Sequence, residues 1–575
     1  MNLARIAAIV LTATLSFSVS AQPVPYSAVV LTGQSVPGVS GATYSWLDQP
    51  AINAAGQVAF FANLQGAGIS VTNNTAIFVG SPGAFGIAAQ SGSPVPGLGD
   101  GSYFSSFTAL LSAPPLNAQG QVAFIANLKG TNVTLANSNC ICVGSPGAVG
   151  VVARTGDAAP GAGSAFSVFS TDPVLGDGSQ VAFAANTSAG GGIWAGAPGS
   201  VGVLAFTGTP APSGGAFFTN VSQYPSINPA GQVAFESYLT GAGINAPNNN
   251  DEGIWIGNST SLSLAVGTGM QAPGAAVGTD FGNPFIGEFA GVTINASGQI
   301  AFQQFLSDAE SDFGIWAGPP GGLNLVALDQ TPAPVMGNLF DGFGPAFLGD
   351  GGHVVFEGYL TSGPIVLFAG LPGAATPIAW TGMTAPGTTN ATFSAFNQGG
   401  TFINVNCYGQ IAFMATLTGS GVTSENNSGI WASDGAGCLY LVARTGSALN
   451  IGGTLRTVYS LSLAGKGGGA DGQPGFFNDA GQLAFLVVFD DLSRGIFMAT
   501  IPAAMRLSPP KIVGADIQFT FTSANNTNYA IQYKDDLGSN GWFVLYPQVT
   551  STGGNTTVTD SNAAALPRRF YRVSQ

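Results

Sequence analysis

Apolar and polar residues alternate in eight short runs along the chain, and each run follows a turn signal. In the second run the apolar side chains return at every other position, at Val122, Phe124, Ala126 and Leu128. A period of two is that of a β-strand with one buried face. The runs therefore predict eight equivalent strands, which contain the phenylalanines Phe60, Phe124, Phe183, Phe235, Phe302, Phe356, Phe413 and Phe485.

The turn before each strand has a common opening. Two copies begin with Gly-Asp-Gly, at Gly176 and Gly349, and the other six begin with Asn-x-x-Gly. Asn and Gly both tolerate positive φ, which is why they are typical of turns. A turn that leads into a strand eight times over indicates a repeat architecture. The six asparagines are Asn53, Asn117, Asn228, Asn295, Asn406 and Asn478.

Two further motifs recur between these strands. One is an Ala-Arg-Thr-Gly run, as at residues 153–156 and 443–446, and the other is a Gly-Ile-Trp run with Trp194, Trp255, Trp316 and Trp431. With a Phe-rich approach strand they make four strands, A to D, in each repeat. Repeats of roughly 50 to 70 residues with four strands are typical of β-propeller blades. Because the aromatic position recurs in nearly every repeat, we expect it to lie in the core between blades.

The two ends of the repeat region complement each other. Residues 28–33 form a D-type strand without a preceding repeat, whereas the last repeat stops after its C strand at 495–497. An open solenoid offers no reason to divide one repeat between its ends. A ring does, because pairing the two ends removes an exposed strand edge. We therefore expect residues 22–503 to form an eight-bladed β-propeller closed by the N-terminal strand.

The termini differ from the repeats. Residues 1–21 combine Arg5, an apolar run and small residues before the end, which is typical of a secretory signal peptide. No later run reaches the roughly 18 apolar residues that a membrane span needs. The Pro-rich residues 504–511 interrupt the pattern, and residues 512–575 return to alternating strands. We expect a linker at 504–511 and a small immunoglobulin- or fibronectin-like β-sandwich at 512–575.

Composition supports the all-β interpretation and narrows the choice of partners. The chain has 85 Gly, 39 Phe and only 7% charged residues, whereas long helices favour Ala, Leu, Glu and Lys. Its formal net charge is −14, and most of its acidic residues lie in the repeat region. Binding of nucleic acid needs Lys and Arg at the phosphates, so this charge argues against such a partner.

Few residues offer catalytic chemistry. His353 is the single histidine and stands where other copies have Gln, which indicates a substitution within the repeat rather than a catalytic base. Glu236 and Glu357 follow the motif Phe, a position that is mostly apolar in the other copies. A carboxylate pair about 5–10 Å apart could cleave glycosides, but equivalent positions two blades apart would usually be farther apart. The simpler hypothesis is that both are hydrogen-bonded or solvent-facing strand residues.

A metal site and a disulfide are also predicted. Asp308, Glu310 and Asp312 lie in a B–C loop and offer hard oxygen ligands for calcium, although a solvated acidic loop is the simpler alternative. Cys407 lies in the A–B turn of the seventh repeat and Cys438 lies just before its D strand. These two turns share a face of a blade, so we expect a Cys407–Cys438 disulfide in an exported chain.

The Asn-x-x-Gly-x-Val-Ala-Phe units, alternating with Gly-Ile-Trp and Ala-Arg-Thr-Gly, resemble the choice-of-anchor tandem repeat proteins of the NxxGxxAF type, which bacteria secrete. The resemblance covers about residues 27–503. It implies export and association with the cell envelope, outside the cell or on its outer surface, and it implies no catalytic residues. Members of that family commonly end in a sorting anchor with an apolar helix and a basic tail, whereas this chain ends in the β module.

The predicted B–C loops vary most and share a polar character, as at residues 66–74, 241–249 and 419–427. Variable loops on a rigid scaffold are where function is usually placed. Their Asn, Ser and Thr side chains suit neutral hydrogen bonds to glycans or protein surfaces. We expect a non-catalytic binding or scaffold propeller whose ligand is an extracellular glycan or a surface protein. The alternatives are a polysaccharide hydrolase or lyase that uses ring carboxylates, and a purely structural surface protein.

Overall fold

In the computed structural model the chain divides into two compact units. One comprises Ala21–Ser433 with Leu439–Ile501, and the other includes Pro502–Gln575. The structure describes residues 24–108, 113–212, 214–244, 250–282, 292–307, 313–335, 337–396, 402–435, 437–465, 470–502, 508, 510–523, 528–536, 538, 541–551, 554–566 and 569–574. The predicted signal peptide, residues 1–21, lies outside these ranges, as does most of the predicted linker.

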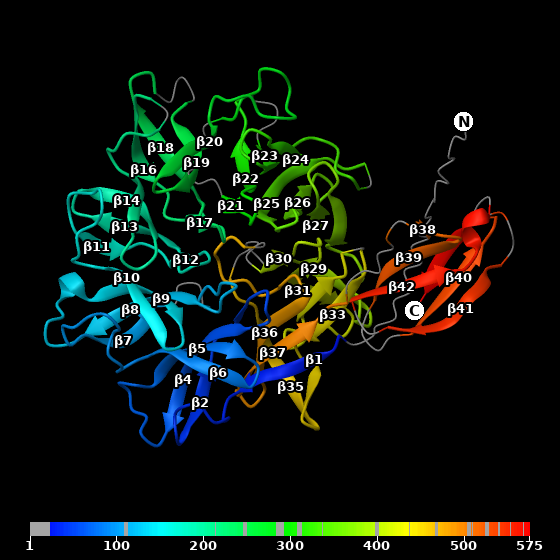
Figure 1. The fold of residues 1–575 in the computed structure, drawn as a ribbon, viewed down its shortest axis with the longest axis horizontal. Coiled ribbons are helices and arrows are strands. Elements are labelled where there is room, and N and C mark those ends of the chain that lie inside the picture. Colours follow the sequence, from blue (N-terminus) through cyan, green and yellow to red (C-terminus); the bar gives the residue numbers. More distant parts are fainter. Residues whose placement is uncertain are drawn as a thin grey trace. The chain divides into compact units, whose positions relative to one another are not determined.

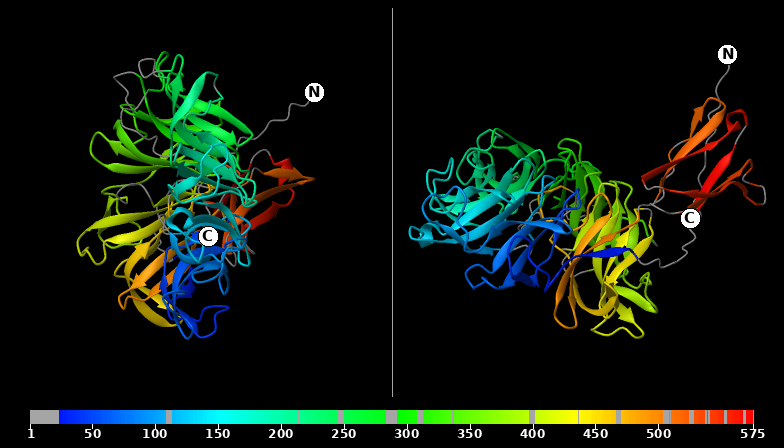
Figure 2. Two further views of the ribbon diagram at one scale, coloured as in Figure 1. Left: turned by 90° about the vertical axis from the view of Figure 1, so that its left-hand side faces the viewer. Right: turned by 60° about the horizontal axis from the view of Figure 1, so that its bottom comes forward.

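The described residues of the repeat region form eight antiparallel sheets, numbered 1 to 8 in chain order, one for each repeat. Figure 1 shows these sheets following one another around a ring, from blue through green to orange, and Figure 2 shows the ring from two further sides. The first four sheets comprise β2 (Ala42–Leu47), β3 (Ala51–Ile52), β4 (Val58–Gly66), β5 (Thr75–Ser81) and β6 (Ala84–Gln90); β7 (Tyr103–Thr108), β8 (Val122–Lys129), β9 (Asn139–Ser145) and β10 (Ala148–Arg154); β11 (Phe166–Phe169), β12 (Val174–Leu175), β13 (Val181–Thr187), β14 (Gly190–Gly196) and β15 (Gly202–Phe206); and β16 (Ala216–Val221), β17 (Ser226–Ile227), β18 (Val233–Gly241), β19 (Glu252–Asn258) and β20 (Ser261–Gly267).

The remaining four sheets repeat the order of approach strand, motif strand, Gly-Ile-aromatic strand and outer strand. They comprise β21 (Thr293–Ile294), β22 (Ile300–Phe305), β23 (Phe313–Gly318) and β24 (Asn324–Leu328); β25 (Phe340–Leu348), β26 (Val354–Leu360), β27 (Ile365–Gly370) and β28 (Thr376–Trp380); β29 (Ala391–Ala395), β30 (Ile403–Val405), β31 (Ile411–Gly419), β32 (Ser428–Ser433) and β33 (Leu439–Arg444); and β34 (Ala448–Ile451), β35 (Thr454–Ser462), β36 (Gln482–Phe489), β37 (Arg494–Thr500) and β1 (Tyr26–Leu31). A short 3₁₀ helix, η1, spans Leu135–Asn137.

The N-terminal strand closes the ring, as the sequence predicts. β1 pairs antiparallel with β37, with Tyr26 opposite Ala499 and Leu31 opposite Gly495. Val30 is buried in the same core cluster as residues of sheet 1. The first strand of the repeat region thus completes the sheet of the last repeat, so that the edge of β37 away from β36 is paired. The all-β propeller architecture is confirmed.

The motif asparagines join neighbouring turns around the ring. Asn478 donates through Nδ2 to the carbonyl oxygen of Asn53 at 2.9 Å, which links the last repeat to the first. The same atom also donates to Oε1 of Gln482 in its own turn, and Oδ1 accepts from the backbone amides of Ala480 and Gln482. Equivalent inter-turn bonds of 2.9–3.2 Å are donated by Asn53, Asn117, Asn228, Asn295 and Asn406.

The motif glycines lie against a side chain of the preceding repeat, which leaves no room for a Cβ. Gly120 has a φ of +73°, and a Cβ at that position would lie 2.7 Å from Oε1 of Gln57 in the preceding repeat. A side chain is therefore excluded both by conformation and by space. His353 lies against Gly409 in the same way, since a Cβ on Gly409 would lie 2.8 Å from its ring. The prediction that His353 replaces a repeat Gln agrees with this position.

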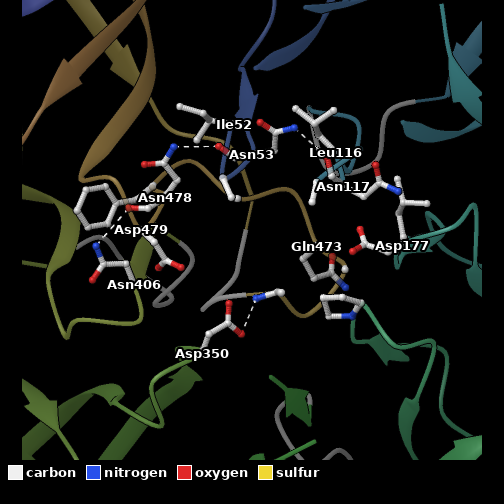
Figure 3. Close-up of a pocket in the computed structure, with 18 of the residues that line it drawn as sticks. Ile52, Asn53, Leu116, Asn117, Asp177, Asp350, Asn406, Gln473, Asn478 and Asp479 are labelled. Carbon is white, nitrogen blue, oxygen red and sulfur yellow. Dashed lines mark hydrogen bonds between the residues drawn. The ribbon is translucent and has the colours of Figure 1, made fainter. Parts of the chain in front are cut away.

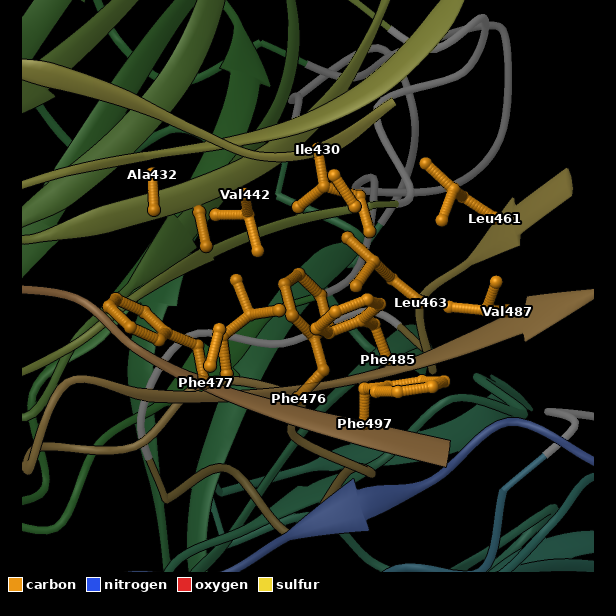
Figure 4. Close-up of a cluster of buried hydrophobic side chains, with 14 of the residues drawn as sticks. Ile430, Ala432, Val442, Leu461, Leu463, Phe476, Phe477, Phe485, Val487 and Phe497 are labelled. Atoms are coloured by element: carbon orange, nitrogen blue, oxygen red, sulfur yellow. The ribbon is translucent and has the colours of Figure 1, made fainter. Parts of the chain in front are cut away.

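Aromatic residues fill the space between adjacent sheets. Trp194, Trp255, Trp316 and Trp431 are fully buried, and three of them donate through Nε1 to a proline carbonyl near the start of their own repeat. Figure 4 shows one such interface, where Ile430 and Val442 of sheet 7 pack against Leu461, Phe485 and Phe497 of the last sheet. The aromatic series is therefore core, as predicted, and each buried ring contributes about 2–3 kcal/mol of hydrophobic stabilisation.

The segment Ala470–Phe477, before β36, crosses the centre of the ring. Its backbone accepts from Ile52 at Gly475, from Leu175 at Gly472 and from Ile227 at Asp471. Its Ala470 amide donates to Oδ1 of Asp350. One segment thus contacts repeats 1, 3, 4 and 6, and it plugs the central channel between them.

The C-terminal unit is a small β-sandwich. One sheet contains β38 (Lys511–Val513), β39 (Asp516–Ser523) and β42 (Gly554–Asp560), and the other contains β40 (Asn528–Lys534), β41 (Phe543–Thr550) and β43 (Phe570–Ser574). A 3₁₀ helix, η3, spans Ala563–Ala565. The sheets share a core of Phe519, Phe521, Tyr529, Ile531, Val558 and Tyr571. Among the described residues there is no helix with the length and hydropathy of a membrane span.

The predicted Cys407–Cys438 disulfide is wrong for this structure, in which both residues are free thiols. Sheet 7 has the order β29-β31-β32-β33, so the A–B turn and the C–D turn are about two strand spacings, or roughly 10 Å, apart. A disulfide needs Cα atoms within about 7 Å. Each turn is also held in place, since the Cys407 amide donates to Asp479 and the Cys438 amide donates to Asp434.

Candidate functional site

The sequence-predicted site residues do not come together in one place. Glu236 lies on β18 and Glu357 on β26, two repeats apart, and both are buried. Asp308, Glu310 and Asp312 fall outside the described residues, so calcium binding there stays a prediction. Among the described residues, no group of three or more His, Cys, Asp or Glu side chains is arranged to hold a metal ion.

One cavity, here called the axial cavity, has a volume of about 140 Å³ and lies at the centre of the A–B turns. Figure 3 shows Asn53, Asn117, Asn406 and Asn478 around it, with Gln473 of the plug between them. Three carboxylates, Asp177, Asp350 and Asp479, also line it.

Two of the three axial carboxylates, Asp350 and Asp479, hold parts of the fold together. Asp350 accepts from the amides of Ala296 and Ala470, and Asp479 accepts from the amide of Cys407. Burial raises the pKa of Asp350, the two backbone donors lower it and Asp479 raises it again. These two acids hold the A–B turns and the segment Ala470–Phe477 in place. The axial cavity is therefore a structural centre, whose channel is filled by that segment.

The second cavity, here called the sheet-4 cavity, has a volume of about 230 Å³ and is lined by residues 220–224, residues 236–238 and Glu252. Residues 222–225 form a break in the approach strand between β16 and β17. The break is tied to the motif strand, because the Ser222 amide donates to the Glu236 carbonyl. The cavity is thus built from the approach strand, the end of β18 and the start of β19.

Strand register brings two glutamates and a tyrosine onto one wall of this cavity. Tyr238 on β18 is directly opposite Glu252 on β19, and Glu236 is opposite Ile254 in the same regular ladder. Side chains two residues apart on a strand share a face, so Glu236, Tyr238 and Glu252 point the same way. The backbone of Glu252 is held by Thr268, whose amide donates to the Glu252 carbonyl.

The carboxyl group of Glu252 has an unusual environment. The residue is 2% exposed, and its Oε2 has no hydrogen-bond partner. Burial and neighbouring Asp251 raise its pKa and a hydrogen bond from Tyr238 lowers it, and together they bring it to about 7. Burial and the surrounding carboxylates of Glu252, Asp251 and Glu236 raise the pKa of Tyr238 to about 12. Near neutral pH, Glu252 is therefore present in both protonation states, next to a neutral phenol.

The sheet-4 cavity also has an aromatic rim. Tyr224, in the break of the approach strand, is 57% exposed. The wall and rim thus offer an unpartnered carboxyl oxygen, amide groups from Asn220 and Gln223, and an exposed ring. A buried polar atom without a partner is costly, so a ligand with a hydroxyl or amine donor would bind there favourably.

Glu357 is a buried glutamate at the equivalent position of the motif strand in sheet 6. It is 4% exposed and its Oε1 has no hydrogen-bond partner. Burial raises its pKa to about 7 as well. Glu357 does not line the sheet-4 cavity. It is therefore a suitable reference for any effect that depends on burial of a glutamate alone.

Sequence reasoning singled out Glu236 but missed Tyr238 and the role of Glu252. The sequence analysis placed the preceding residues 241–249 in a B–C loop and gave Glu252 no role, whereas the structure places Glu252, buried, at the first residue of β19. The available signal was the strand pattern itself. Aligning the Gly-Ile-Trp motif of Gly253–Trp255 with the motif strand would have placed Glu252 opposite Tyr238.

The ring of antiparallel sheets and its plugged centre define the protein as a β-propeller. The chain belongs to a family of unknown function, DUF7453, whose profile matches residues 16–191 and 111–504 in two overlapping stretches. No curated protein matches the sequence.

Solved structures similar to this chain include β-propeller proteins of different activities. The β-propeller domain of the Trilobed protease from Pyrococcus furiosus is 10% identical, with a TM-score of 0.34, and the match covers 70% of this chain and 98% of that one. A puromycin-hydrolyzing peptidase from Mycobacterium tuberculosis is 11% identical with a TM-score of 0.33, over 77% of this chain and 58% of the peptidase. The polysaccharide lyase Uly1 is 10% identical with a TM-score of 0.30, over 82% of this chain and 94% of the lyase. Similarity at this level concerns the fold and carries no information about function.

Proposed function

We propose that this chain is an exported β-propeller that binds an extracellular saccharide in the sheet-4 cavity. The observation that carries the proposal is the buried Oε2 of Glu252, which has no hydrogen-bond partner and lines a cavity of about 230 Å³. A saccharide hydroxyl would donate to this oxygen. The desolvation cost of an unpaired buried carboxyl, about 1–3 kcal/mol, would then be recovered on binding.

The other groups at the cavity suit the same ligand class. Asn220 and Gln223 bring amide side chains, which both donate and accept. Tyr224 offers an exposed ring on which the apolar face of a sugar can pack. The cavity is smaller than the roughly 300–1,000 Å³ of sites for drug-sized ligands. Its occupant would therefore be about one sugar residue in size, such as the end or one unit of a longer chain.

The sequence supports the extracellular setting. Residues 1–21 have the features of a secretory signal, and the repeats resemble those of choice-of-anchor proteins. We infer from these two features that the propeller acts outside the cell or at the cell envelope of a bacterium. The remaining ligand class predicted from the sequence, a surface protein, is distinguished by the experiment below.

A glycan array probed with the purified full-length chain tests the proposal. We expect retention of one or a few related glycans, with affinity lowered at least tenfold by Glu252→Gln, because a hydrogen bond to a charged group contributes about 1.5–3 kcal/mol. Tyr224→Ala should also weaken binding.

Two matched variants serve as controls. Glu357→Gln changes a glutamate that is equally buried but outside the cavity, and Tyr459→Ala removes a tyrosine that is 62% exposed on β35. Both should bind like the wild type. Retention of no glycan would refute saccharide binding and favour a protein partner. Retention that Glu252→Gln and Tyr224→Ala leave unchanged would refute the sheet-4 cavity as the site.

A further inference from the structure

The sheet-4 cavity brings two carboxyl groups close together within one repeat. In the ladder between β18 and β19, Tyr238 is opposite Glu252 and Glu236 precedes Tyr238 by two residues on the same face. Glu236 and Glu252 are therefore diagonal neighbours, for which the Cα separation in antiparallel sheets is about 7–8 Å and the Cβ separation is somewhat less. Carboxyl groups that cleave glycosides lie about 5–10 Å apart. Strand positions at this separation allow the two carboxyl groups to lie within that spacing, which Glu236 and Glu357, on separate sheets, were not expected to do.

From this geometry we propose that the chain hydrolyses a glycosidic bond in the sheet-4 cavity, with Glu252 as general acid and Glu236 as the base that activates water. The inference rests on the proposed saccharide binding and adds a reaction to it. Glu252 has the better position for the acid, because it is 2% exposed and its Oε2 is open to a ligand.

The step balances without a cofactor. The Glu252 carboxyl transfers its proton to the glycosidic oxygen as the bond from the anomeric carbon to that oxygen breaks. A water molecule attacks the anomeric carbon from the opposite side, and the Glu236 carboxylate accepts its proton. One water is consumed and two sugar hydroxyls are formed. Exchange with solvent then returns Glu252 to the acid form and Glu236 to the carboxylate.

The electrostatics support the assignment of the acid. Burial and Asp251 hold the pKa of Glu252 near 7, so a proton is available in the neutral range. The titratable groups beside this carboxyl are Tyr238 and Glu236 on β18 and Asp251, which directly precedes β19. Tyr238 hydrogen-bonds to Glu252, and we infer that it positions the acid and keeps its own proton.

The test measures reducing ends released from the oligosaccharides that the glycan array retains, together with a panel of 4-nitrophenyl glycosides as defined probes. We expect release by the wild-type chain, with a kcat that falls as pH rises above about 7, as Glu252 loses its proton. Glu252→Gln and Glu236→Gln should each lower kcat at least 100-fold, the usual contribution of general acid–base catalysis. Glu357→Gln should leave kcat unchanged.

The experiment distinguishes failure of the binding proposal from failure of the hydrolysis proposal. Retention on the array without release of reducing ends would overturn the hydrolysis and leave the binding proposal standing. Release that persists in both Glu236→Gln and Glu252→Gln would place the cleavage at another site. Absence of binding to every glycan would overturn both proposals. Tyr238→Phe should shift the alkaline limb of the pH profile, and an unshifted limb with lowered kcat would give Tyr238 a purely structural role.

Discussion

Replacement of Asn478 by Ala tests the closure of the ring. Asn478 makes four hydrogen bonds, one of which reaches the carbonyl oxygen of Asn53 across the junction between the last and first repeats. A hydrogen bond contributes a net 0.5–1.5 kcal/mol, so the loss of four should lower the free energy of unfolding by about 2–6 kcal/mol. Asn117→Ala removes the same four bonds within the ring and should cost the same amount.

Guanidinium denaturation followed by tryptophan fluorescence measures the effect, because Trp194, Trp255, Trp316 and Trp431 are fully buried in the folded protein. Asn63→Ala is the matched control, since Asn63 is exposed on β4 and the substitution should shift the midpoint little. If Asn478→Ala were as mild as Asn63→Ala while Asn117→Ala cost several kcal/mol, the ring would be open at the junction in solution. If all three were mild, the role given to the asparagine links would be wrong.

Three further perturbations test other parts of the structure. Burial raises the pKa of Glu357 from 4.5 to about 7, so between these pH values the folded state holds a proton that the unfolded state releases. Glu357 by itself should therefore contribute a loss of roughly 3 kcal/mol of stability as pH rises from about 4.5 through 7. Glu357→Gln should match the wild type at pH 5 and be more stable at pH 8, and a difference that does not change with pH would contradict the argument. A thiol reagent should find four free thiols in denaturant without reductant, whereas a count of two would indicate the Cys407–Cys438 disulfide. In the folded protein the exposed Cys438 should react first, and Cys407 should react slowly because burial and Asp479 raise its pKa to about 12. The buried Cys140 and Cys142 should not react in the folded protein. His353→Gln restores the residue of the other repeats and should change the free energy of unfolding by less than about 0.5 kcal/mol; a loss of glycan binding or hydrolysis in this variant would show that the histidine has a function.

The repeat motif itself carried most of the information about the fold. The period of two before Leu128 predicts a strand, and the unmatched strand at residues 28–33 predicts the closure that β1 and β37 make. The motif Asn and Gly predict a turn. A second reason for these residue types is found only in the contacts between neighbouring repeats of the folded ring. Asn117 reaches the carbonyl of the next repeat, and Gly120 leaves room for Gln57 of the previous one. Local sequence cannot display these contacts, because their partners are more than 50 residues away.

The disulfide was mispredicted for a reason of the same kind. The sequence correctly placed Cys407 and Cys438 in turns at the same end of a sheet. The separation between those turns, however, depends on the order and spacing of the strands. The four-stranded order puts two strand widths between them. The two cysteines therefore lie at the same end of the sheet, but too far apart across its width to form a disulfide.

The same distinction between local and long-range information applies to the fold as a whole and to the candidate site. The sequence by itself determined that the chain is built from β repeats, that its ends join, that aromatic rings fill the spaces between sheets, and that Glu236 is an unusual acid at an apolar position. It did so because alternation, turns and recurrence are local properties of the chain. Only the tertiary structure decided that Ala470–Phe477 plugs the centre, that the axial acids are used to hold turns, and that Glu252 faces a cavity beside Tyr238 and Glu236. Those outcomes depend on which strand residues stand opposite one another and on what remains unfilled between them, and neither is fixed until the whole ring has packed.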